Sequence, residues 1–310
     1  MILKNYVSFF ACILILIACR PNADKNADVH YDAIKTFQNV ALKVKNDTSL
    51  LNIYRSFLLT LDTNRMESST GAAVEFTNLF KGQPTNICDR AYFLFDQYDE
   101  KLCENIDQIH FKDTSIIYDS LLTGSLKTHY QLSDKLKRYA QKLKVNGFKV
   151  YMSEGDSDIG RDLDFVAKWF YRYVSPVMKE YLIQLNKEDN QGFSEDAGLT
   201  ISPRQFVDRT VWWEKFTVKH PGSVVYNEAE KNWKEYLGTL LYGMENSPVI
   251  SYDQRSIRNY YKDAYAYLNY SYPATKTNKI VDPYFKLLLQ KDTEEANKLL
   301  KLYQKKGIIL

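Results

Sequence analysis

The chain has 310 residues and a formal net charge of +3, with cations and anions interspersed along its length. This near-neutral balance, without a block of like charges, argues against a protein that binds nucleic acid. The 24 tyrosines contrast with only 12 glycines and 8 prolines, and so few helix-breaking residues favour long packed elements over a loop-rich module.

The first segment has the pattern of a secretory signal. Lys4 precedes an apolar run from Tyr6 to Ala18 that only Ser8 interrupts, and a cation followed by a short apolar run is typical of a signal peptide. The run is shorter than the roughly 20 residues of a membrane-spanning helix. It ends in the sequence Leu16-Ile17-Ala18-Cys19, which resembles the lipobox of bacterial lipoproteins.

The lipobox resemblance covers this segment alone and implies cleavage of residues 1–18, with a lipid attached to Cys19. In the enterobacterial sorting pattern, an aspartate two residues after the cysteine keeps a lipoprotein at the inner membrane. This chain has Pro21 there, which by analogy favours the outer membrane. The alternative is an ordinary signal peptide, or an anchor helix in which the cysteine is incidental. Residues 19–30 are polar and lack an apolar period, so they are expected to form a flexible tether.

Helical periodicity dominates the rest of the chain, residues 31–310. In the N-terminal half, helices are predicted over 31–44, 47–62, 88–103 and 113–147, the last as one long helix or a pair meeting near Gly124. Residues 148–152 alternate between apolar and polar and predict the one strand. A helix is then expected from Ile159 to 189, divided or kinked at Pro176.

The two cysteines that remain after cleavage, Cys88 and Cys103, lie in one predicted helix. Fifteen residues of helix separate them by about 22 Å, whereas a disulfide needs Cα atoms within roughly 7 Å. A bond between them would require a break in that helix, so two buried thiols are expected.

In the C-terminal half, Ser202-Pro203 predicts a helix start, because serine caps a helix and proline suits its first position. Helices are expected over 204–220, 227–244, 253–272, 282–290 and 292–307. About ten helices with short connections predict an all-α fold, an irregular array of antiparallel helix pairs with at most a minor strand near 148–152. The body forms a single domain, or two lobes that meet near 147–160, where glycines and acids replace the helical period.

The segment 151–165, YMSEGDSDIGRDLDF, concentrates acidic residues around two glycines. Asp156 and Asp158 would suit the N-terminus of the helix expected from Ile159, where acids satisfy free N–H groups. A calcium loop is a second interpretation, but the spacing fails the EF-hand pattern, and no metal or cofactor is predicted. A third is glycoside hydrolysis, with Glu154 as the acid and Asp156 or Asp164 as its partner.

Aromatic side chains suggest a second candidate site. Trp212 and Trp213 diverge by about 100° on a helix, so one is expected in the core and the other partly exposed. Tyr261 and Tyr265 belong to a tyrosine-rich helix with more rings than one core stripe needs. Exposed rings could stack on sugars or bind a peptide, and the alternative is that they pack in the core and direct their hydroxyls to water.

These patterns predict a membrane-anchored bacterial lipoprotein, held to the lipid bilayer through acylated Cys19, whose helical body binds an unknown protein or glycan at the cell envelope. Trp212, Trp213, Tyr261 and Tyr265 are its candidate binding residues. An envelope glycan hydrolase that uses Glu154 and a nearby aspartate is the alternative.

Overall fold

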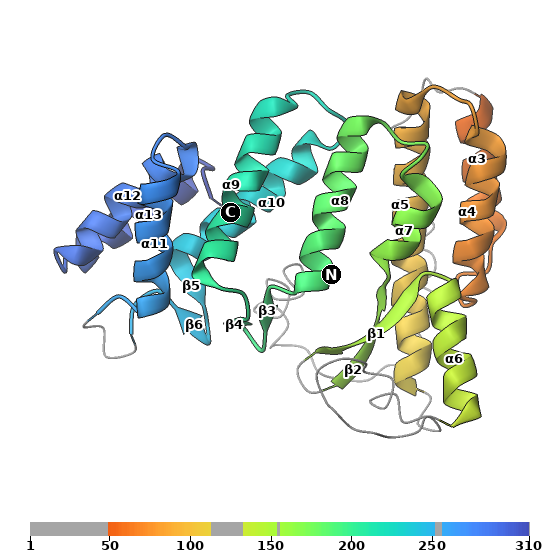
Figure 1. Cartoon of the computed structure of the whole chain (residues 1–310), viewed down its shortest axis with the longest axis horizontal. Helices are drawn as coiled ribbons and strands as arrows, with labels where there is room; N and C mark the ends of the chain where they lie inside the picture. Colours follow the sequence, from red (N-terminus) through yellow and green to blue (C-terminus); the bar gives the residue numbers. More distant parts are fainter. Residues whose placement is uncertain (1–48, 113–132, 154–155, 252–255, 310) are drawn as a thin grey trace. The chain divides into compact units, whose positions relative to one another are not determined.

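The computed structural model describes residues 49–112, 133–153, 156–251 and 256–309. In these ranges it contains eleven helices and three small antiparallel sheets of two strands each (Figure 1). The predicted all-α class with a minor strand component is therefore confirmed. The signal segment, Cys19, the tether and the helix expected over 31–44 lie outside the described residues.

The chain divides into two compact units, Met1–Asp189 and Asn190–Leu310, and each is described by itself. Residues 147–160, where the sequence suggests a possible division, contribute to a β-hairpin of the first unit. The elements of this unit are α3 (Ser49–Thr60), α4 (Glu67–Phe80), α5 (Thr85–Lys112), α6 (Asp134–Val145), β1 (Phe148–Ser153), β2 (Asp156–Arg161), α7 (Leu163–Phe170) and α8 (Pro176–Gln191), the last running two residues past the division.

The core of unit 1 is aromatic. Phe76 of α4 packs against Phe170 of α7 with ring centroids 4.7 Å apart, and Phe95 of α5 lies 4.4 Å from the same ring. All three side chains are fully buried, and burying each stabilises the fold by roughly 1.5–3 kcal/mol. This cluster holds α4, α5 and α7 together.

Helix α5 runs unbroken through both cysteines, as the sequence predicts. Cys88 and Cys103 are buried and form no disulfide with each other, in agreement with the separation that a continuous helix imposes. The predicted division at Pro176 is also observed, because this proline begins α8 after a break that follows α7. Proline suits the first helical turn, where its missing N–H is not needed.

The expectation that a helix starts at Ile159 is wrong. Residues Asp156–Arg161 form β2, which pairs antiparallel with β1 in the register Val150 with Ile159. The helix begins three residues after Gly160, at Leu163, and Asp162 caps it by accepting the N–H of Asp164 at 3.0 Å. Alternation in DSDIGR explains the strand, since Ile159 is fully buried while Gly160 on the opposite face lies under the ring of Tyr151.

The hairpin is fixed to α5 through Arg161. Its Nε donates to Asp99 and its Nη2 donates to Asp96, each at 2.7 Å. Ser69 of α4 donates to the second oxygen of Asp99 at 2.6 Å. The backbone N–H of Ile159 also donates to Asp107 at 2.7 Å. The hairpin is therefore bound to α5 at two places, at Asp96 and Asp99 and again at Asp107.

Unit 2 contains β3 (Ser194–Glu195), β4 (Gly198–Leu199), α9 (Pro203–Lys219), α10 (Tyr226–Tyr242), β5 (Gly243–Met244), β6 (Ser247–Pro248), α11 (Asn259–Ser271), α12 (Lys276–Leu289) and α13 (Thr293–Lys305). Ser202 caps α9 in a reciprocal capping box with Gln205, and Pro203 is the first helical residue, as predicted.

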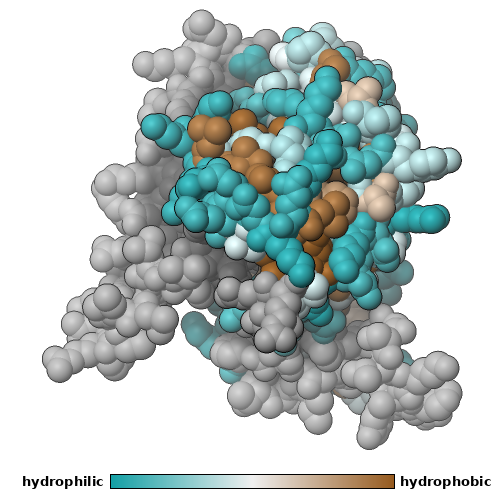
Figure 2. Space-filling view, turned by 90° about the vertical axis from the view of Figure 1, so that its left-hand side faces the viewer, coloured by the Kyte–Doolittle hydropathy of each residue, from teal (hydrophilic) through white to brown (hydrophobic). Residues whose placement is uncertain are grey.

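Figure 2 faces the part of unit 2 that carries α12 and α13, where apolar residues gather in a patch among polar side chains.

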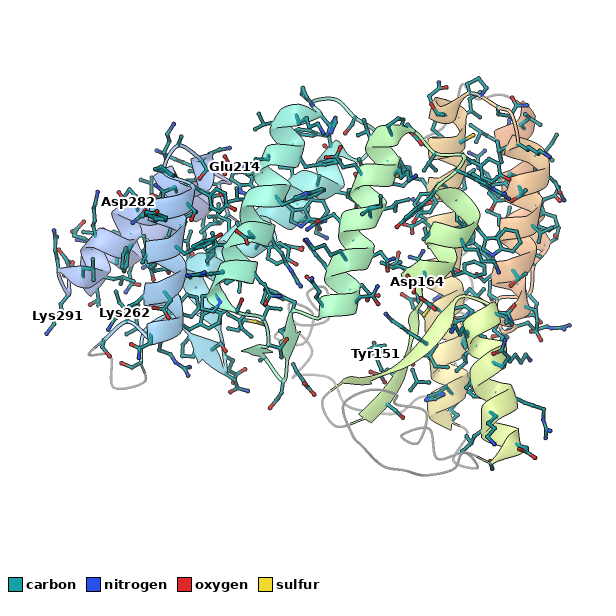
Figure 3. All side chains as sticks on the ribbon, viewed as in Figure 1. Tyr151, Asp164, Glu214, Lys262, Asp282 and Lys291 are labelled. Carbon is teal, nitrogen blue, oxygen red and sulfur yellow. The ribbon has the colours of Figure 1, made fainter. Side chains whose placement is uncertain are left out.

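The start of α12 is held by a buried carboxylate from another helix. Glu214 of α9 accepts the backbone N–H groups of Lys276 and Thr277, both at 2.7 Å, and Figure 3 labels it. Trp233 of α10 donates its ring N–H to the Thr277 hydroxyl at 2.9 Å. A negative charge at a helix N-terminus is favourable, so this contact joins three helices.

Removing the guanidinium at the hairpin should destabilise unit 1 strongly. Arg161→Met leaves Asp96 and Asp99 close together without a cation, and breaking a buried ion pair costs about 3–5 kcal/mol. Urea unfolding followed by circular dichroism measures the loss. Arg138→Met is the control, because Arg138 is exposed on α6 and should change stability by less than about 0.5 kcal/mol. Equal effects of the two variants would contradict this role for Arg161.

Candidate functional site

The acidic candidates are not brought together in the described structure. Asp156 begins β2, and Asp164 lies beyond its other end in the first turn of α7 (Figure 3). The strand alone spans about 16 Å at roughly 3.3 Å per residue, whereas glycosidases place their two carboxyl groups about 5–10 Å apart. The backbone positions of Asp156 and Asp164 thus lend no support to the pair, Glu154 lies outside the described residues, and the hydrolase interpretation stays a prediction.

Asp164 has a structural partner of its own. The exposed Asp164 carboxylate accepts the Asn186 side-chain N–H of α8 at 2.9 Å. Its neighbour Asp162 is partly buried, and burial raises the pKa of the Asp162 carboxyl above its ordinary value. Nearby, Lys149 of β1 forms an ion pair with the buried Asp189 of α8. These contacts tie α7, α8 and the hairpin to one another.

Metal binding gains no support in the described residues. Across 49–112, 133–153, 156–251 and 256–309, no three histidine, cysteine, aspartate or glutamate side chains are grouped so that they could hold a metal ion. Within the same ranges, no helix has the length and apolar character needed to cross a membrane.

Three of the four aromatic candidates are core residues, which corrects their selection as binding residues. Trp213, Tyr261 and Tyr265 are all buried. The Tyr261 hydroxyl donates to the carbonyl oxygen of Ser247 at 2.8 Å, and that of Tyr265 to Leu240 at 2.6 Å. Their rings fill the space between α9, α10 and α11, so packing accounts for them.

Trp212 is the aromatic candidate that reaches the surface. It is half-buried, with its ring stacked on Phe216 at 5.2 Å and 22°. The divergence of Trp212 and Trp213 is therefore as predicted. Helical spacing places Trp212 on the same face of α9 as Arg204, Asp208 and Lys215, which are exposed.

Asp208 organises this surface from its centre. One oxygen, Oδ1, accepts the hydroxyl of Tyr267 at 3.0 Å and that of Tyr272 at 2.7 Å. The two tyrosine rings meet edge to face at 5.9 Å. Burial, followed by the hydrogen bond to Asp208, raises the pKa of the Tyr272 hydroxyl above its ordinary value, so the hydroxyl remains a donor at neutral pH.

Two cations cover the faces of these tyrosines. The Arg204 guanidinium lies 5.4 Å from the centroid of the Tyr267 ring, and the Lys215 ammonium lies 4.9 Å from that of Tyr272. We call this set the α9–α11 face; it consists of Arg204, Asp208, Trp212, Lys215, Tyr267 and Tyr272. It presents an indole, a carboxylate and two cations to solvent on a fixed helical frame, a combination suited to binding a polar ligand.

Sequence reasoning missed most of this face. Arg204, Asp208 and Trp212 recur at intervals of four, so helical spacing alone places them on one surface. The contribution of Tyr267 and Tyr272 depends on how α11 packs on α9, which no local pattern contains.

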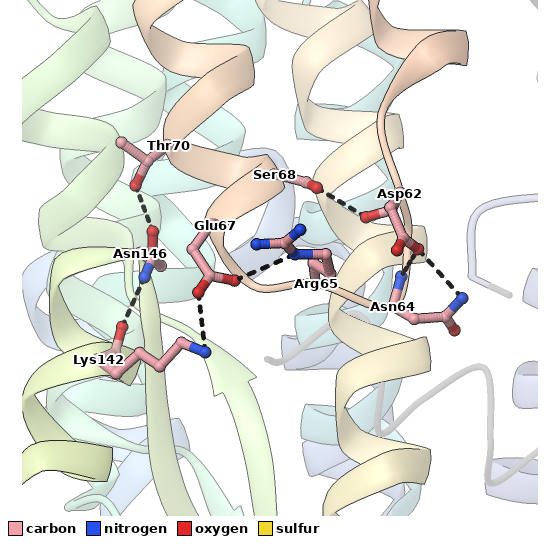
Figure 4. Close-up of polar contacts among 8 residues, drawn as sticks. All are labelled: Asp62, Asn64, Arg65, Glu67, Ser68, Thr70, Lys142 and Asn146. Carbon is pink, nitrogen blue, oxygen red and sulfur yellow. Dashed lines mark hydrogen bonds and ion pairs between the residues drawn. The ribbon is translucent and has the colours of Figure 1, made fainter.

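A cleft of about 280 Å³ lies between α4, α5 and α6 of unit 1. Its rim carries Arg65, Glu67 and Lys142, and Figure 4 shows their contacts. Lys142 donates to Glu67 at 2.8 Å, and this hydrogen bond lowers the pKa of the Glu67 carboxyl. Ligand sites usually measure about 300–1,000 Å³, so the charged rim of this small cleft is best explained as a link between α4 and α6.

Comparison of the chain with protein-family models, with curated proteins and with solved structures gives no match.

The central role of Asp208 predicts a measurable loss of stability. Asp208→Asn keeps the shape but weakens two hydrogen bonds that a carboxylate accepts, and the exposed setting limits the cost to about 1 kcal/mol. Thermal unfolding measures it. Asp263→Asn on α11 is the matched control, since Asp263 is exposed and forms no hydrogen bond or ion pair with the described residues. A loss no greater than that of the control would contradict the role given to Asp208.

Proposed function

We propose that the chain is a lipid-anchored protein of the bacterial cell envelope, held at the outer membrane through Cys19, whose helical body binds a protein or glycan partner. The sequence Leu16-Ile17-Ala18-Cys19 after a short apolar run supports the anchor. The observation that carries the binding role is the α9–α11 face.

The α9–α11 face supports binding because it is built before any ligand arrives. Asp208 fixes two tyrosine hydroxyls, and the Trp212 ring is stacked in place on Phe216. Side chains that are already ordered lose little entropy on binding, and each mobile side chain would otherwise cost about 0.5–1.5 kcal/mol. An indole beside a carboxylate and cations matches the alternating apolar and hydroxyl surfaces of a sugar, or the side chains of a peptide.

Cys19→Ala should abolish lipid attachment, because the acyl acceptor is lost. Metabolic labelling of producing cells with a fatty-acid analogue, followed by membrane fractionation, measures this directly. The unchanged chain should carry label and fractionate with the outer membrane, and Cys19→Ala should carry none. Cys12→Ala, which removes the other cysteine of the leader, is the control and should be labelled normally. Label on Cys19→Ala, or its loss in Cys12→Ala, would overturn the anchor.

Binding by the α9–α11 face is tested with Trp212→Ala. Co-sedimentation of the purified chain with isolated cell-wall glycan measures retention, and loss of a stacking indole should weaken it several-fold. Trp169→Ala is the matched control, because Trp169 is likewise half-buried but lies on α7 of unit 1. Retention that is unchanged in Trp212→Ala would remove glycan from the proposal. Retention reduced equally in both variants would assign the effect to lost stability instead.

A further inference from the structure

Helices α12 and α13 end in the same backbone motif but with different residues. After α12, the N–H of Lys291 donates to Leu288 and that of Asp292 to Leu287. After α13, the N–H of Gly307 donates to Gln304 and that of Ile308 to Tyr303. This paired pattern is the Schellman helix end, and its first residue beyond the cap is left-handed in both, with φ 61° at Lys291 and 64° at Gly307.

Glycine adopts this conformation freely, whereas another residue is disfavoured there by roughly 1–2 kcal/mol. Two other non-glycine residues of the described chain have positive φ, Asp196 and Ala197 in the turn between β3 and β4. That turn is held by Asn246, which donates to the carbonyl oxygens of both residues. The Lys291 side chain forms no hydrogen bond or ion pair with the described residues, so packing does not explain why lysine occupies this position.

Lys291 lies in a basic part of the chain. Residues 276–306 contain eight lysines and four acidic residues, an excess of four cations, whereas the whole chain has a net charge of +3. Each of the four acidic side chains already has a partner within this segment. Asp282 pairs with Lys286, Glu294 and Glu295 pair with Lys298, and Asp292 caps α13. Six exposed lysines form no ion pair with the described residues: Lys276, Lys279, Lys291, Lys301, Lys305 and Lys306.

Each of these helices carries its lysines beside an exposed leucine. On α12, Lys279 and Lys286 share a face that Leu289 borders, and on α13 Lys298, Lys301 and Lys305 share a face that Leu302 borders. Leu289 is 57% exposed and Leu302 41%. Figure 2 shows the apolar patch on this part of unit 2. In Figure 3 Lys291 lies at the end of the α12 ribbon and points away from it.

We propose that this surface, the α12–α13 basic face, contacts the head groups of an anionic lipid bilayer. It consists of Lys279, Lys286, Leu289, Lys291, Lys298, Lys301, Leu302 and Lys305. Clustered lysines attract anionic lipids, and leucines that border them enter the boundary between head groups and acyl chains. The inference rests on the proposed function, since a lipid on Cys19 holds the chain beside a bilayer.

The test uses residues 20–310, which retain every described residue and lack the anchor cysteine, so its result does not depend on lipid attachment. Sedimentation with vesicles of equal parts phosphatidylglycerol and phosphatidylethanolamine is compared with vesicles of phosphatidylcholine alone. Binding is expected to the anionic vesicles only. It should be lost in about 1 M salt, where the screening length falls to roughly 3 Å.

Lys291→Gly separates this role from a structural one. Glycine relieves the left-handed backbone, so the melting temperature should rise, while loss of one charge at the bilayer should weaken binding about fivefold. Leu289→Gln should also weaken binding. The controls are Lys179→Gln and Val218→Gln, which remove an exposed charge and an exposed apolar side chain outside the face, and both should bind normally.

Equal binding to both vesicle types, or normal binding of Lys291→Gly with its fold intact, would overturn the basic face. If either result accompanied normal labelling of Cys19, the anchor would stand and this surface would have no membrane role. A third outcome is that Cys19 carries no label, while the chain binds the anionic vesicles only and Lys291→Gly weakens this binding. The basic face would then stand without the lipid anchor.

Discussion

The placement of the β1–β2 hairpin depends on one guanidinium, Arg161, which two carboxylates of α5 share. Asp96 and Asp99 are three residues apart on a helix and so point the same way, which suits the fork of an arginine side chain. Because Ser69 bonds the second oxygen of Asp99, α4, α5 and the hairpin are fixed at one point. In unit 2 a negatively charged side chain, Glu214, likewise joins separate elements. The Glu214 carboxylate accepts two backbone N–H groups at the start of α12, and so fixes that helix start to α9.

The many tyrosines are explained largely by connections between segments distant in sequence. Tyr54 donates its hydroxyl to Ala72, Tyr265 to Leu240 and Tyr303 to Ile280, in each case to a backbone carbonyl of another helix. A tyrosine can therefore fill the core with its ring and satisfy its own polar atom without a second side chain. Such a hydroxyl needs no water molecule as its acceptor. Tyr267 and Tyr272 differ from these three, because their hydroxyls donate to the exposed side chain of Asp208.

Local patterns predicted those parts of the structure that local physics determines. The all-α class, the unbroken helix through Cys88 and Cys103, the start at Ser202-Pro203 and the break at Pro176 all follow from periodicity and capping. The acids of Asp156–Arg161 suit both a helix start and a strand, so the sequence predicts a helix from Ile159, and the pairing with β1 that favours the strand is not local. Trp213 of α9 and Tyr261 and Tyr265 of α11 illustrate the same limit at the candidate site, since an aromatic ring on a helix can face the core or the surface, and the neighbouring helices decide which.

A tethered protein can use a weak membrane contact that a free protein could not. If Cys19 is acylated and residues 19–30 form a flexible tether, the chain end and the bilayer are separated by about 20 Å on average, from roughly 5–6 Å times the square root of the residue number. Such linkage corresponds to effective concentrations in the millimolar range, so a face of modest affinity would be occupied much of the time. Glycine would fit the backbone at position 291 better than lysine. The lysine is then explained by its charge, because the tether would keep the face near the bilayer and each cation would add to the binding.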